Sequence, residues 1–469
     1  MGALANTLAS HLEFQNLEHG KWLSEFWQTN NLAKQEGLKA VELFDAMHSG
    51  KIKAIWIMAT NPAVSLPNSQ KVKEALEACP FVVVSDCISE TETTQYADVL
   101  LPAQGWSEKS GKVTNSERRI SRQRRLLPSP GLAKPDWWII SQVAQRMDFG
   151  EAFDYVHEGE VFAEYAKLSA EANQRFNLDL NLSGLAHLSD MDYNRLTPQQ
   201  WPVCAPQKRI VNQRFFDNGH FYTPNGKANL IPVSYSQPQS SVTNELPLLL
   251  NTGRTRDHWH TMTRTGLVAQ LCEHSPEPYV LVHPSTAAEY RLTDGKLAAI
   301  SNRYGKVFAI VKISEDMAKN QIFMPIHWNS ATAKQSKVCD LIAPYTDVTS
   351  GQPEFKHTPV RLEPAMMRFQ GVILSRHPIE ALEFDYWAKR KTERGYWYRI
   401  ESSLSLDELK NTVESRLAQV VKGETKTLFH LNSEGFDMSL LGQSRVEVMV
   451  CVGRNLDDSV VENKWKVLN

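Results

Sequence analysis

Long apolar runs and polar breaks alternate in the first part of the chain. The segment IKAIWIMATNP (52–62) is almost continuously apolar and stops at Asn–Pro, as a buried strand does. A helical spacing of apolar positions follows over 69–79, and FVVVSD (81–86) is a second apolar run of strand length. This succession of strand, helix and strand predicts a parallel sheet that is buried on both faces.

The same alternation continues beyond the second strand. Residues 89–97 predict a short helix with Ser89 as its cap and Glu92 completing a capping box. Residues 98–103, DVLLPA, predict a third strand. We therefore expect an α/β domain with a doubly wound parallel sheet over residues 1–150.

The first residues of the chain are helical by pattern but carry no start signal. Leu4, Leu8 and Leu12 repeat at helical spacing, and no capping residue precedes them. The pattern indicates that the sequence begins within a helix. We therefore expect the α/β domain to be truncated at its N-terminus.

The pattern becomes irregular after the α/β domain and then changes its period. Residues 151–245 hold amphipathic fragments and a loop-rich stretch, which we interpret as a helical excursion and a connector. From there the chain shows short alternating strands, tight turns and one helix at PSTAAEYRL. Such strands predict a small closed or nearly closed β-barrel over 246–364.

The remaining residues, 365–469, mix strands with a single clear helix. A capping box of Ser405 and Glu408 opens that helix. The mixture predicts a small α+β extension at the C-terminus. No catalytic motif is visible in it.

Composition excludes several classes of protein. The chain has 469 residues, 42% of them apolar, and a net charge of −2, so no overall field attracts it to nucleic acid or membrane. The six cysteines form no C-x-x-C pair, which favours free thiols. Neither a signal peptide nor a spanning apolar run is visible. We expect a cytoplasmic protein that does not bind a membrane.

One basic stretch raises the question of nucleic acid. Five arginines lie within the eight residues from Arg118 to Arg125. The stretch has Glu117 beside it and no interleaved aromatic residues, so we interpret it as a solvated or salt-bridged surface. We expect no nucleic-acid partner.

The ends of the predicted strands supply the first candidates for a site. Ligands of parallel sheets bind beyond the carboxyl ends of the strands, where Asn61, Ser85 and Asp86 lie in this sequence. The alternative is structural, because Asn before Pro is common in turns and Asp after a strand often caps a helix. Topology alone leaves both readings open.

The first barrel strand runs into a loop that is unusually rich in donors, NTGRTRDHWHTMTRTG (251–266). Backbone N–H groups, arginines and hydroxyls in this arrangement can surround phosphate oxygens, and Gly253 allows close approach. Two alternatives remain: His258 and His260 as a metal pair, or polar residues that satisfy only one another. We favour a nucleotide-like anion.

Taken together, these segments resemble one known family. The chain is similar to the molybdenum-dependent oxidoreductases that use bis(molybdopterin guanine dinucleotide), and most similar to the C-terminal part of bacterial assimilatory nitrate reductases. The segments that carry the resemblance are IKAIWIMATNP, VVVSD, DVLLPA, WSEKSGKVTNSERR, GLAKPDWW, NTGRTRDHWHTMTRTG and SGQPEFKHTPV. It implies that the barrel is a double-psi fold that binds the molybdopterin dinucleotide.

The resemblance also implies a set of cofactor contacts. Arg264 resembles a position in the substrate funnel and would attract nitrate by its charge; the alternative is an ion pair in the barrel rim. Lys109 would reach a pyrophosphate, Asp136 would accept from the guanine, and Lys356 would contact the pterin. The full set of implied cofactor-binding residues is Asn61, Ser85, Asp86, Lys109, Asp136, Thr252, Gly253, Arg254, Thr255, His258, Trp259, His260, Thr261 and Lys356.

The implied reaction is the two-electron reduction of nitrate to nitrite at molybdenum. The family carries its iron–sulfur cysteines and its molybdenum ligand in the N-terminal part, so the resemblance implies no metal ligand here and an inactive chain without that half. The half would be on the same or a separate chain, with an electron-donor protein or NAD(P)H-linked subunit as a further partner. Alternatives are a formate dehydrogenase-like enzyme, or a non-catalytic cofactor-binding subunit or remnant.

Overall fold

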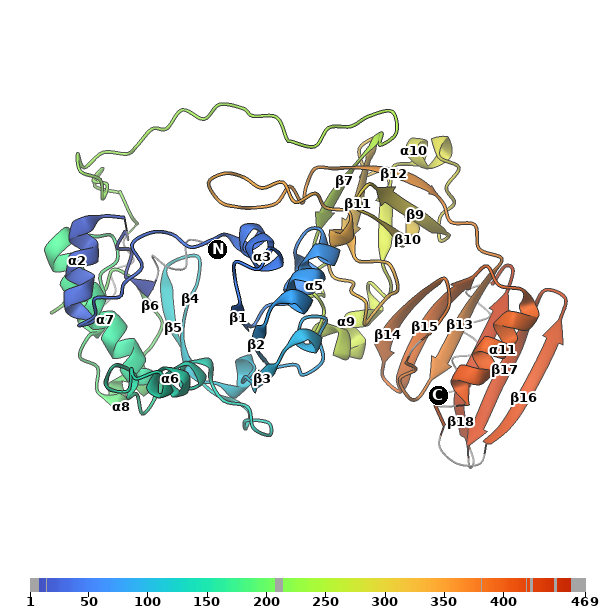
Figure 1. Cartoon of the computed structure of the whole chain (residues 1–469), viewed down its shortest axis with the longest axis horizontal. Helices are drawn as coiled ribbons and strands as arrows, with labels where there is room; N and C mark the ends of the chain where they lie inside the picture. The colour runs from blue at the N-terminus through green and yellow to red at the C-terminus, as the bar shows by residue number, and fades with distance from the viewer. Residues whose placement is uncertain are drawn as a thin grey trace.

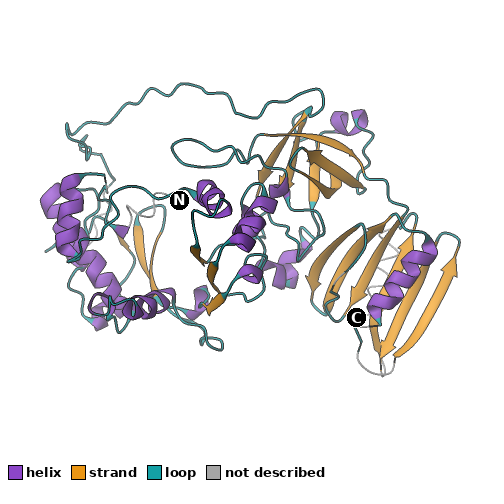
Figure 2. Ribbon diagram, viewed as in Figure 1, coloured by secondary structure: helices purple, strands orange, loops and turns teal. Residues whose placement is uncertain are grey.

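A computed structural model describes residues 8–13, 15–206, 214–380, 382–418, 420–421, 425–442 and 445–456. Three bodies follow one another along the molecule (Figure 1): an N-terminal body of helices and small sheets, a barrel, and a C-terminal sheet. Helices are concentrated in the first body and strands in the other two (Figure 2). The predicted helix start at Leu4 lies outside the described residues.

The parallel sheet is confirmed. Strands β1 (Ala54–Met58), β2 (Phe81–Asp86) and β3 (Val99–Pro102) pair in parallel in the order β1-β2-β3. Helices α3 (Ala40–His48) and α5 (Ser69–Ala78) pack on it through a shared apolar core. The strands end at one edge of the sheet, which carries the residues expected at a ligand site.

The short helix predicted over 89–97 is wrong in extent and in its cap. Only a 3-10 turn forms, at Thr94–Tyr96, and the hydroxyl of Thr91 accepts the N–H of Thr94 at 3.1 Å. Glu92 does not complete a capping box, because it is buried against the barrel at 3.5 Å from the Lys337 ammonium. Glu92 therefore forms an ion pair with Lys337 of the barrel and does not cap a helix in its own segment.

The helical stretch after residue 150 packs against the first residues of the chain. Leu168 and Ala172 of α7 share a core with Leu12 and Leu23. The boundary expected at 150 therefore lies inside a packed unit. Its elements are α2 (Leu17–Phe26), the hairpin β4 (Gly111–Thr114) and β5 (Arg119–Gln123), α6 (Asp136–Arg146), α7 (Glu158–Phe176), α8 (Asp190–Arg195) and β6 (Gln199–Gln200), which pairs with β5.

The arginine-rich stretch lies in this hairpin, and several of its side chains contact other residues of the same body. Arg122 contacts Glu158 at 3.0 Å, and Arg124 donates to the Asn194 carbonyl at 2.9 Å. Arg118 lies over the ring of Phe215. The interpretation of a salt-bridged surface is confirmed at Arg122.

The β-barrel is confirmed and is closed. It consists of β7 (Leu248–Gly253), β8 (Tyr279–Val282), β9 (Leu297–Asn302), β10 (Gly305–Ile313), β11 (Gln321–Pro325) and β12 (Thr358–Pro364), in the order β10-β8-β11-β7-β12-β9. The predicted helix is α10 (Pro284–Glu289). Strands β7 and β11 are parallel neighbours, with Gly253 opposite Pro325. The segments that leave these two strands therefore emerge side by side.

The C-terminal extension is a six-stranded antiparallel sheet with one helix, which confirms the α+β prediction. The sheet order is β14-β15-β13-β18-β17-β16. Its elements are β13 (Phe369–Ser375), β14 (Tyr386–Thr392), β15 (Gly395–Ser402), α11 (Leu406–Leu417), β16 (Thr425–Asn432), β17 (Gly435–Gly442) and β18 (Arg445–Gly453). Ser405 and Glu408 form the predicted capping box. In the described part of the chain, no helix is long and apolar enough to cross a bilayer.

The C-terminal sheet is joined to the barrel through its edge strand β14. Ala388 forms an antiparallel bridge with Ala333, and the flanking N–H groups of Lys334 and Lys389 donate across it at 2.8 and 2.7 Å. Tyr386 is fully buried in the same apolar cluster as Trp328. The joint is therefore both hydrogen-bonded and apolar.

A buried ion cluster crosses the same joint. The Arg399 guanidinium lies 3.0 Å from Glu401 and 3.5 Å from Glu277 of the barrel side. Burial raises the pKa of both carboxyls, and the charge of Arg399 opposes this rise.

The cluster predicts a large cost for removing its cation. Arg399→Met should lower the free energy of unfolding by about 3 kcal/mol, because two buried carboxylates lose their partner. Urea unfolding followed by tryptophan fluorescence measures this. The control is Arg361→Met, which breaks the exposed Arg361–Glu363 pair and should cost under about 1 kcal/mol. Equal losses in the two variants would contradict the account.

Candidate functional site

The donor-rich loop is shaped by close packing at its start and by left-handed backbone at its end. A Cβ on Gly253 would come within 2.7 Å of the Phe323 ring, so only glycine fits where β7 ends. His260 and Met262 adopt positive φ values of 44° and 58°. The loop thereby turns back toward the barrel.

One buried imidazole, that of His327, holds the loop at two interior points, Thr255 and His260. Nε2 of His327 accepts the N–H of Thr255 at 2.8 Å, and its Nδ1 lies 2.7 Å from the carbonyl of His260. These partners fix a neutral ring with the proton on Nδ1. Burial lowers its pKa to about 4, assisted by the nearby His258 and Arg254. A second proton, on Nε2, would point at the N–H of Thr255 and break that hydrogen bond.

The loop is also tied to the α/β sheet, 200 residues away in sequence. Asn61 donates to the Thr261 hydroxyl at 3.3 Å and accepts from the Thr93 hydroxyl at 2.6 Å. Asn329 donates to the Thr261 carbonyl at 2.5 Å. The structure therefore brings the predicted residues Asn61 and Thr261 together, at the junction of the two domains.

The outer side of the loop carries two arginines that form no ion pair among the described residues. Arg254 and Arg264 are exposed and have no hydrogen-bond acceptor or carboxylate partner among the described residues, and Arg254 lies 5.9 Å from the Trp259 ring centroid. The Trp259 side chain is 54% exposed. The Thr255 hydroxyl is buried and has no hydrogen-bond partner within the part of the chain that the structure describes. Free guanidinium groups, an orphaned hydroxyl and an open aromatic face suit an anionic ligand with a planar ring.

His258 faces the interior, unlike its neighbours on the loop. It is buried, with ring nitrogens 3.4 Å from the Thr265 hydroxyl and 3.4 Å from the Ser275 carbonyl. Burial lowers its pKa, and also that of the more exposed His260. Among the described residues no group of three His, Cys, Asp or Glu side chains could hold a metal ion.

The strand-end residues of the α/β sheet divide into two kinds. Ser85 is fully buried, and its hydroxyl accepts from the Trp56 indole at 2.8 Å, so it is not directed to a ligand. Asp86 is half-buried and accepts the N–H of Ile88 at 3.2 Å. Asp86 keeps one carboxylate oxygen outside this turn.

Two further predicted residues contact each other. Lys109 and Asp136 form a half-buried ion pair at 2.7 Å. Asp136 is the first residue of α6, where a carboxylate also interacts favourably with the helix dipole. A nucleotide at this position would exchange the ion pair for its own phosphate and base contacts.

Lys356 and Thr252 are joined at the base of the loop. The Lys356 ammonium donates to the Thr252 carbonyl, and the Thr252 hydroxyl donates to the Phe355 carbonyl at 2.7 Å. The late barrel segment is therefore anchored where the loop leaves β7. Nζ of Lys356 would also be 3.9 Å from a Cβ on Gly253.

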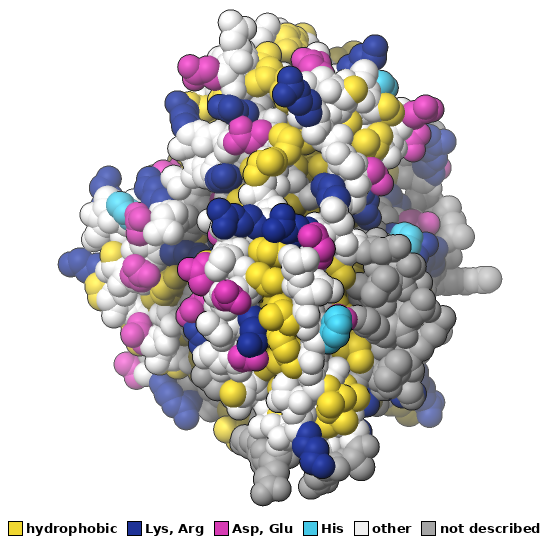
Figure 3. Space-filling model, turned by 90° about the vertical axis from the view of Figure 1, so that its right-hand side faces the viewer, with side chains coloured by type: hydrophobic (Ala, Val, Ile, Leu, Met, Phe, Trp, Pro, Cys, Tyr) yellow, Lys and Arg dark blue, Asp and Glu magenta, His cyan; other side chains and the backbone are white. Residues whose placement is uncertain are grey.

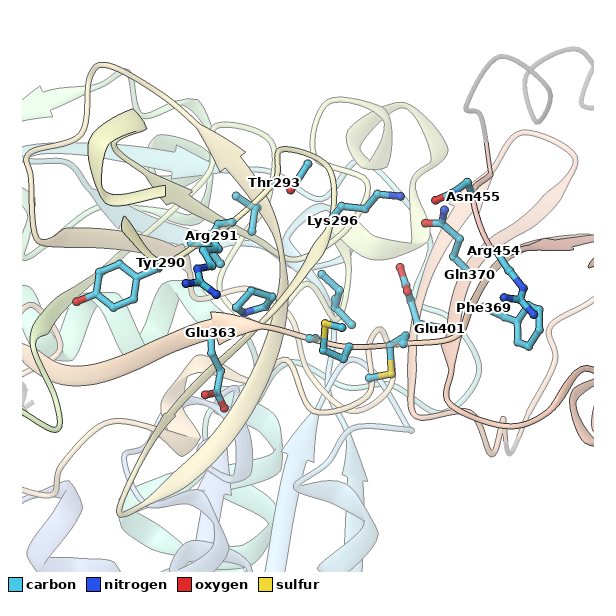
Figure 4. Close-up of a pocket in the computed structure, with 17 residues that line it drawn as sticks. Tyr290, Arg291, Thr293, Lys296, Glu363, Phe369, Gln370, Glu401, Arg454 and Asn455 are labelled. Carbon is cyan, nitrogen blue, oxygen red and sulfur yellow. The ribbon is translucent and has the colours of Figure 1, made fainter. Parts of the chain in front are cut away.

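A separate cavity of about 680 Å³ lies between the barrel and the C-terminal sheet (Figure 4). None of the described residues predicted to bind a cofactor lines it. This cavity is therefore distinct from the donor-rich loop. Charged and amide side chains around the cavity include Arg291, Lys296, Glu363, Gln370, Glu401 and Arg454.

Sequence analysis missed the residues that support the loop, His327, Trp328 and Asn329. Their signal was present, because these polar residues directly follow the strand QIFMP, as the donor-rich loop follows β7. Parallel neighbours end at the same edge, so both segments belonged to one set of candidates.

Comparison with known families agrees with this geometry. The family model described as "Molybdopterin oxidoreductase" matches residues 2–146, and "Molydopterin dinucleotide binding domain" matches residues 248–359, which include the loop. The chain belongs to the molybdopterin oxidoreductase family. The C-terminal sheet lies beyond both matched regions.

Individual relatives of the chain carry several names. "Nitrate reductase" of Klebsiella oxytoca is 42% identical over 394 residues, covering 84% of this chain and 44% of the relative. "Nitrate reductase" of Shewanella frigidimarina is 42% identical over 422 residues, covering 85% and 45%. "F420-dependent formate dehydrogenase subunit alpha" of Methanocaldococcus jannaschii is 34% identical over 333 residues, covering 71% and 46%. The chain spans just under half the length of these relatives.

A solved structure supports the fold. Acetylene hydratase from Pelobacter acetylenicus matches with a TM-score of 0.54 at 19% identity, covering 69% of this chain and 46% of that one. At this identity the likeness concerns the fold alone. It agrees with the observed parallel sheet followed by a closed barrel.

The His327 geometry predicts a loss of stability in acid. Its folded pKa of about 4 lies below the ordinary 6.5, so the unfolded chain binds the proton more readily between these values. Stability should be complete above pH 6.5 and fall by about 2 kcal/mol toward pH 4, allowing for partial solvent screening. Urea unfolding at several pH values measures this.

The matched variant is His327→Gln, whose amide can donate and accept at the same two positions but cannot titrate. The difference in unfolding free energy between wild type and variant should change with pH only between about pH 6.5 and pH 4. A difference that is constant from pH 7 to pH 4 would show that His327 does not titrate as the structure requires.

Proposed function

We propose that this chain forms the pterin- and nucleotide-binding part of an assimilatory nitrate reductase. The observation that carries the proposal is the donor-rich loop, in which Arg254 and the Thr255 hydroxyl have no partner among the described residues. The chain is also 42% identical to two proteins named nitrate reductase. The cofactor would be molybdenum–bis(molybdopterin guanine dinucleotide), and the substrate nitrate. When bound, this group supplies a metal centre for two-electron oxygen-atom transfer.

The residues of the loop would divide the work of binding. Arg254 and the Thr255 hydroxyl would donate to phosphate oxygens, as charge-assisted bonds favour. Trp259, open on one face, would stack on a planar ring. His258 would act indirectly, because it is buried and packs against Trp328. His327 would keep the loop in its binding shape before the ligand arrives, which reduces the entropy lost on binding.

The second nucleotide would lie along the α/β sheet edge. Asp86 and Asn61 mark that edge, and the Lys109–Asp136 pair lies further along the chain. Lys109 would turn to a pyrophosphate and Asp136 to the guanine N–H groups, so each charge would gain a new partner as the ion pair opens. Arg264, exposed beside the loop, would attract nitrate by its charge.

The proposal assigns no metal ligand to this chain. It assigns the molybdenum ligand, and any iron–sulfur cluster, to the length of the relatives that these 469 residues do not span. That polypeptide and an electron-donor protein or NAD(P)H-linked subunit would be its partners. The cytoplasm is the proposed location, in keeping with free cysteines.

A formate dehydrogenase is the second candidate, because a relative with that name is 34% identical to the chain. Dye-linked assays of the complete enzyme separate the two. We expect nitrate to oxidise a reduced viologen dye and formate not to reduce the oxidised dye. Formate-dependent reduction without nitrate activity would favour the second candidate, and neither activity would favour a non-catalytic subunit.

The loop assignment predicts a difference between two arginines that lie two positions apart. Arg254→Met should lower the guanine nucleotide released from the purified complete enzyme by about tenfold or more, because a charge-assisted phosphate contact of about 1.5–3 kcal/mol is lost. The control is Arg256→Met, because Arg256 is 75% exposed and already paired with Asp257 at 2.9 Å. Mass spectrometry of the acid-released nucleotide measures both. Full nucleotide content in Arg254→Met, or equal loss in the control, would contradict the assignment.

A further inference from the structure

The C-terminal sheet has one closed edge and one open edge. Strand β14 at the first edge is paired with the barrel through Ala333 and Ala388. Strand β16 at the other edge pairs only with β17 among the described residues, and all eight of its residues are exposed. No described strand pairs with its outer row of N–H and C=O groups, so this row can pair with another strand.

The open edge is long, regular and partly apolar. The pairing of β16 with β17 runs without a bulge from Thr425 to Asn432, and the strand contains no proline. Leu428, Phe429 and Leu431 remain 62%, 37% and 47% exposed. Figure 3, which views the molecule from this side, shows hydrophobic side chains gathered in a band there. Exposed edge strands usually carry charged side chains, prolines or bulges that prevent pairing with another strand. Strand β16 has one lysine, Lys426, and no aspartate or glutamate.

The two faces of β16 can be assigned from its register. Phe429 lies opposite Met438 and stacks on Phe436 with centroids 5.6 Å apart, so it shares the face that α11 covers. Thr427 and Leu431 share this face, because side chains alternate along a strand. Leu428 and its alternate neighbours lie on the other face.

We propose that β16 pairs antiparallel with β16 of a second copy of this chain, about a two-fold axis at Phe429. A two-fold axis perpendicular to a sheet must pass through one position, so that each residue meets a partner on its own face. Phe429 then faces itself, an aromatic cross-strand pair, and Thr427 faces Leu431.

The strand is complementary to itself in this register. On the second face Leu428 meets His430, and Lys426 meets Asn432, so no cation faces another cation. An axis one residue earlier, at Leu428, would place Lys426 opposite His430. Axes at Thr427 or Leu431 would also keep Lys426 away from His430, but they would pair fewer residues of this eight-residue strand. The axis at Phe429 combines the longest pairing with separated charges, and this self-complementarity is the argument for a second copy as the occupant.

The paired sheets would form one continuous sheet with both α11 helices on the same face. Strand β16 lies at the end of the molecule remote from the N-terminal body (Figure 1), so the cofactor loop stays open in the pair. An eight-residue edge buries less than a standard interface, so association should be reversible and depend on concentration.

Sedimentation analysis of the full chain with charged variants at the axis tests the proposal. Wild type should shift from monomer to dimer between about 1 and 100 µM. Phe429→Lys and Phe429→Glu should each stay monomeric, because like charges would meet at the axis. An equimolar mixture of the two variants should form a heterodimer, because the opposite charges then pair.

Two controls separate edge pairing from loss of fold or of surface apolarity. Leu230→Glu changes a 92% exposed residue of the connector and should leave the dimer intact. Circular dichroism should show unchanged strand content in both Phe429 variants. A monomeric wild type over the whole range, a dimer that survives both single variants, or a mixture that stays monomeric would each overturn the proposal.

Discussion

The neutral imidazole of His327 is the contact on which the shape of the site depends. Its ring accepts from the N–H of Thr255 and donates to the carbonyl of His260, so it joins two points of the loop that are five residues apart. Because burial keeps it uncharged, it adds no cation beneath the guanidinium of Arg254. The loop can therefore present its donors outward to an anion while its own backbone is satisfied inward.

Packing from all three bodies converges on this ring and its neighbours. Asn61 reaches the loop from the α/β sheet, and the buried Glu92–Lys337 pair fastens that sheet to the barrel. From the other side, β14 pairs with the segment that follows Trp328. The C-terminal sheet thus packs against the segment around Trp328, which in turn holds the loop. This sheet lies outside the matched family regions.

Much of the fold followed from local patterns. Continuous apolar runs predicted the parallel strands, and short alternating strands predicted the closed barrel, because each pattern reflects which faces are buried. The short helix at 89–97 failed because Glu92 found a partner in the barrel, beyond the reach of local capping rules. His258 was expected to face a ligand together with its neighbours on the loop, yet it is buried and packs against Trp328, a contact that depends on a segment distant in sequence. Contacts such as Asn61 with Thr261 depend on the docking of two domains.

The most direct measurement is a cryo-electron microscopy map of the complete enzyme purified with its cofactor. The account predicts pyrophosphate density within hydrogen-bonding distance of the Arg254 guanidinium and the Thr255 hydroxyl, with Trp259 against a planar ring. It also predicts that His327 keeps both of its backbone partners. Cofactor density elsewhere, such as in the cavity beside Lys296 and Glu401, with the loop empty, would contradict the central claim.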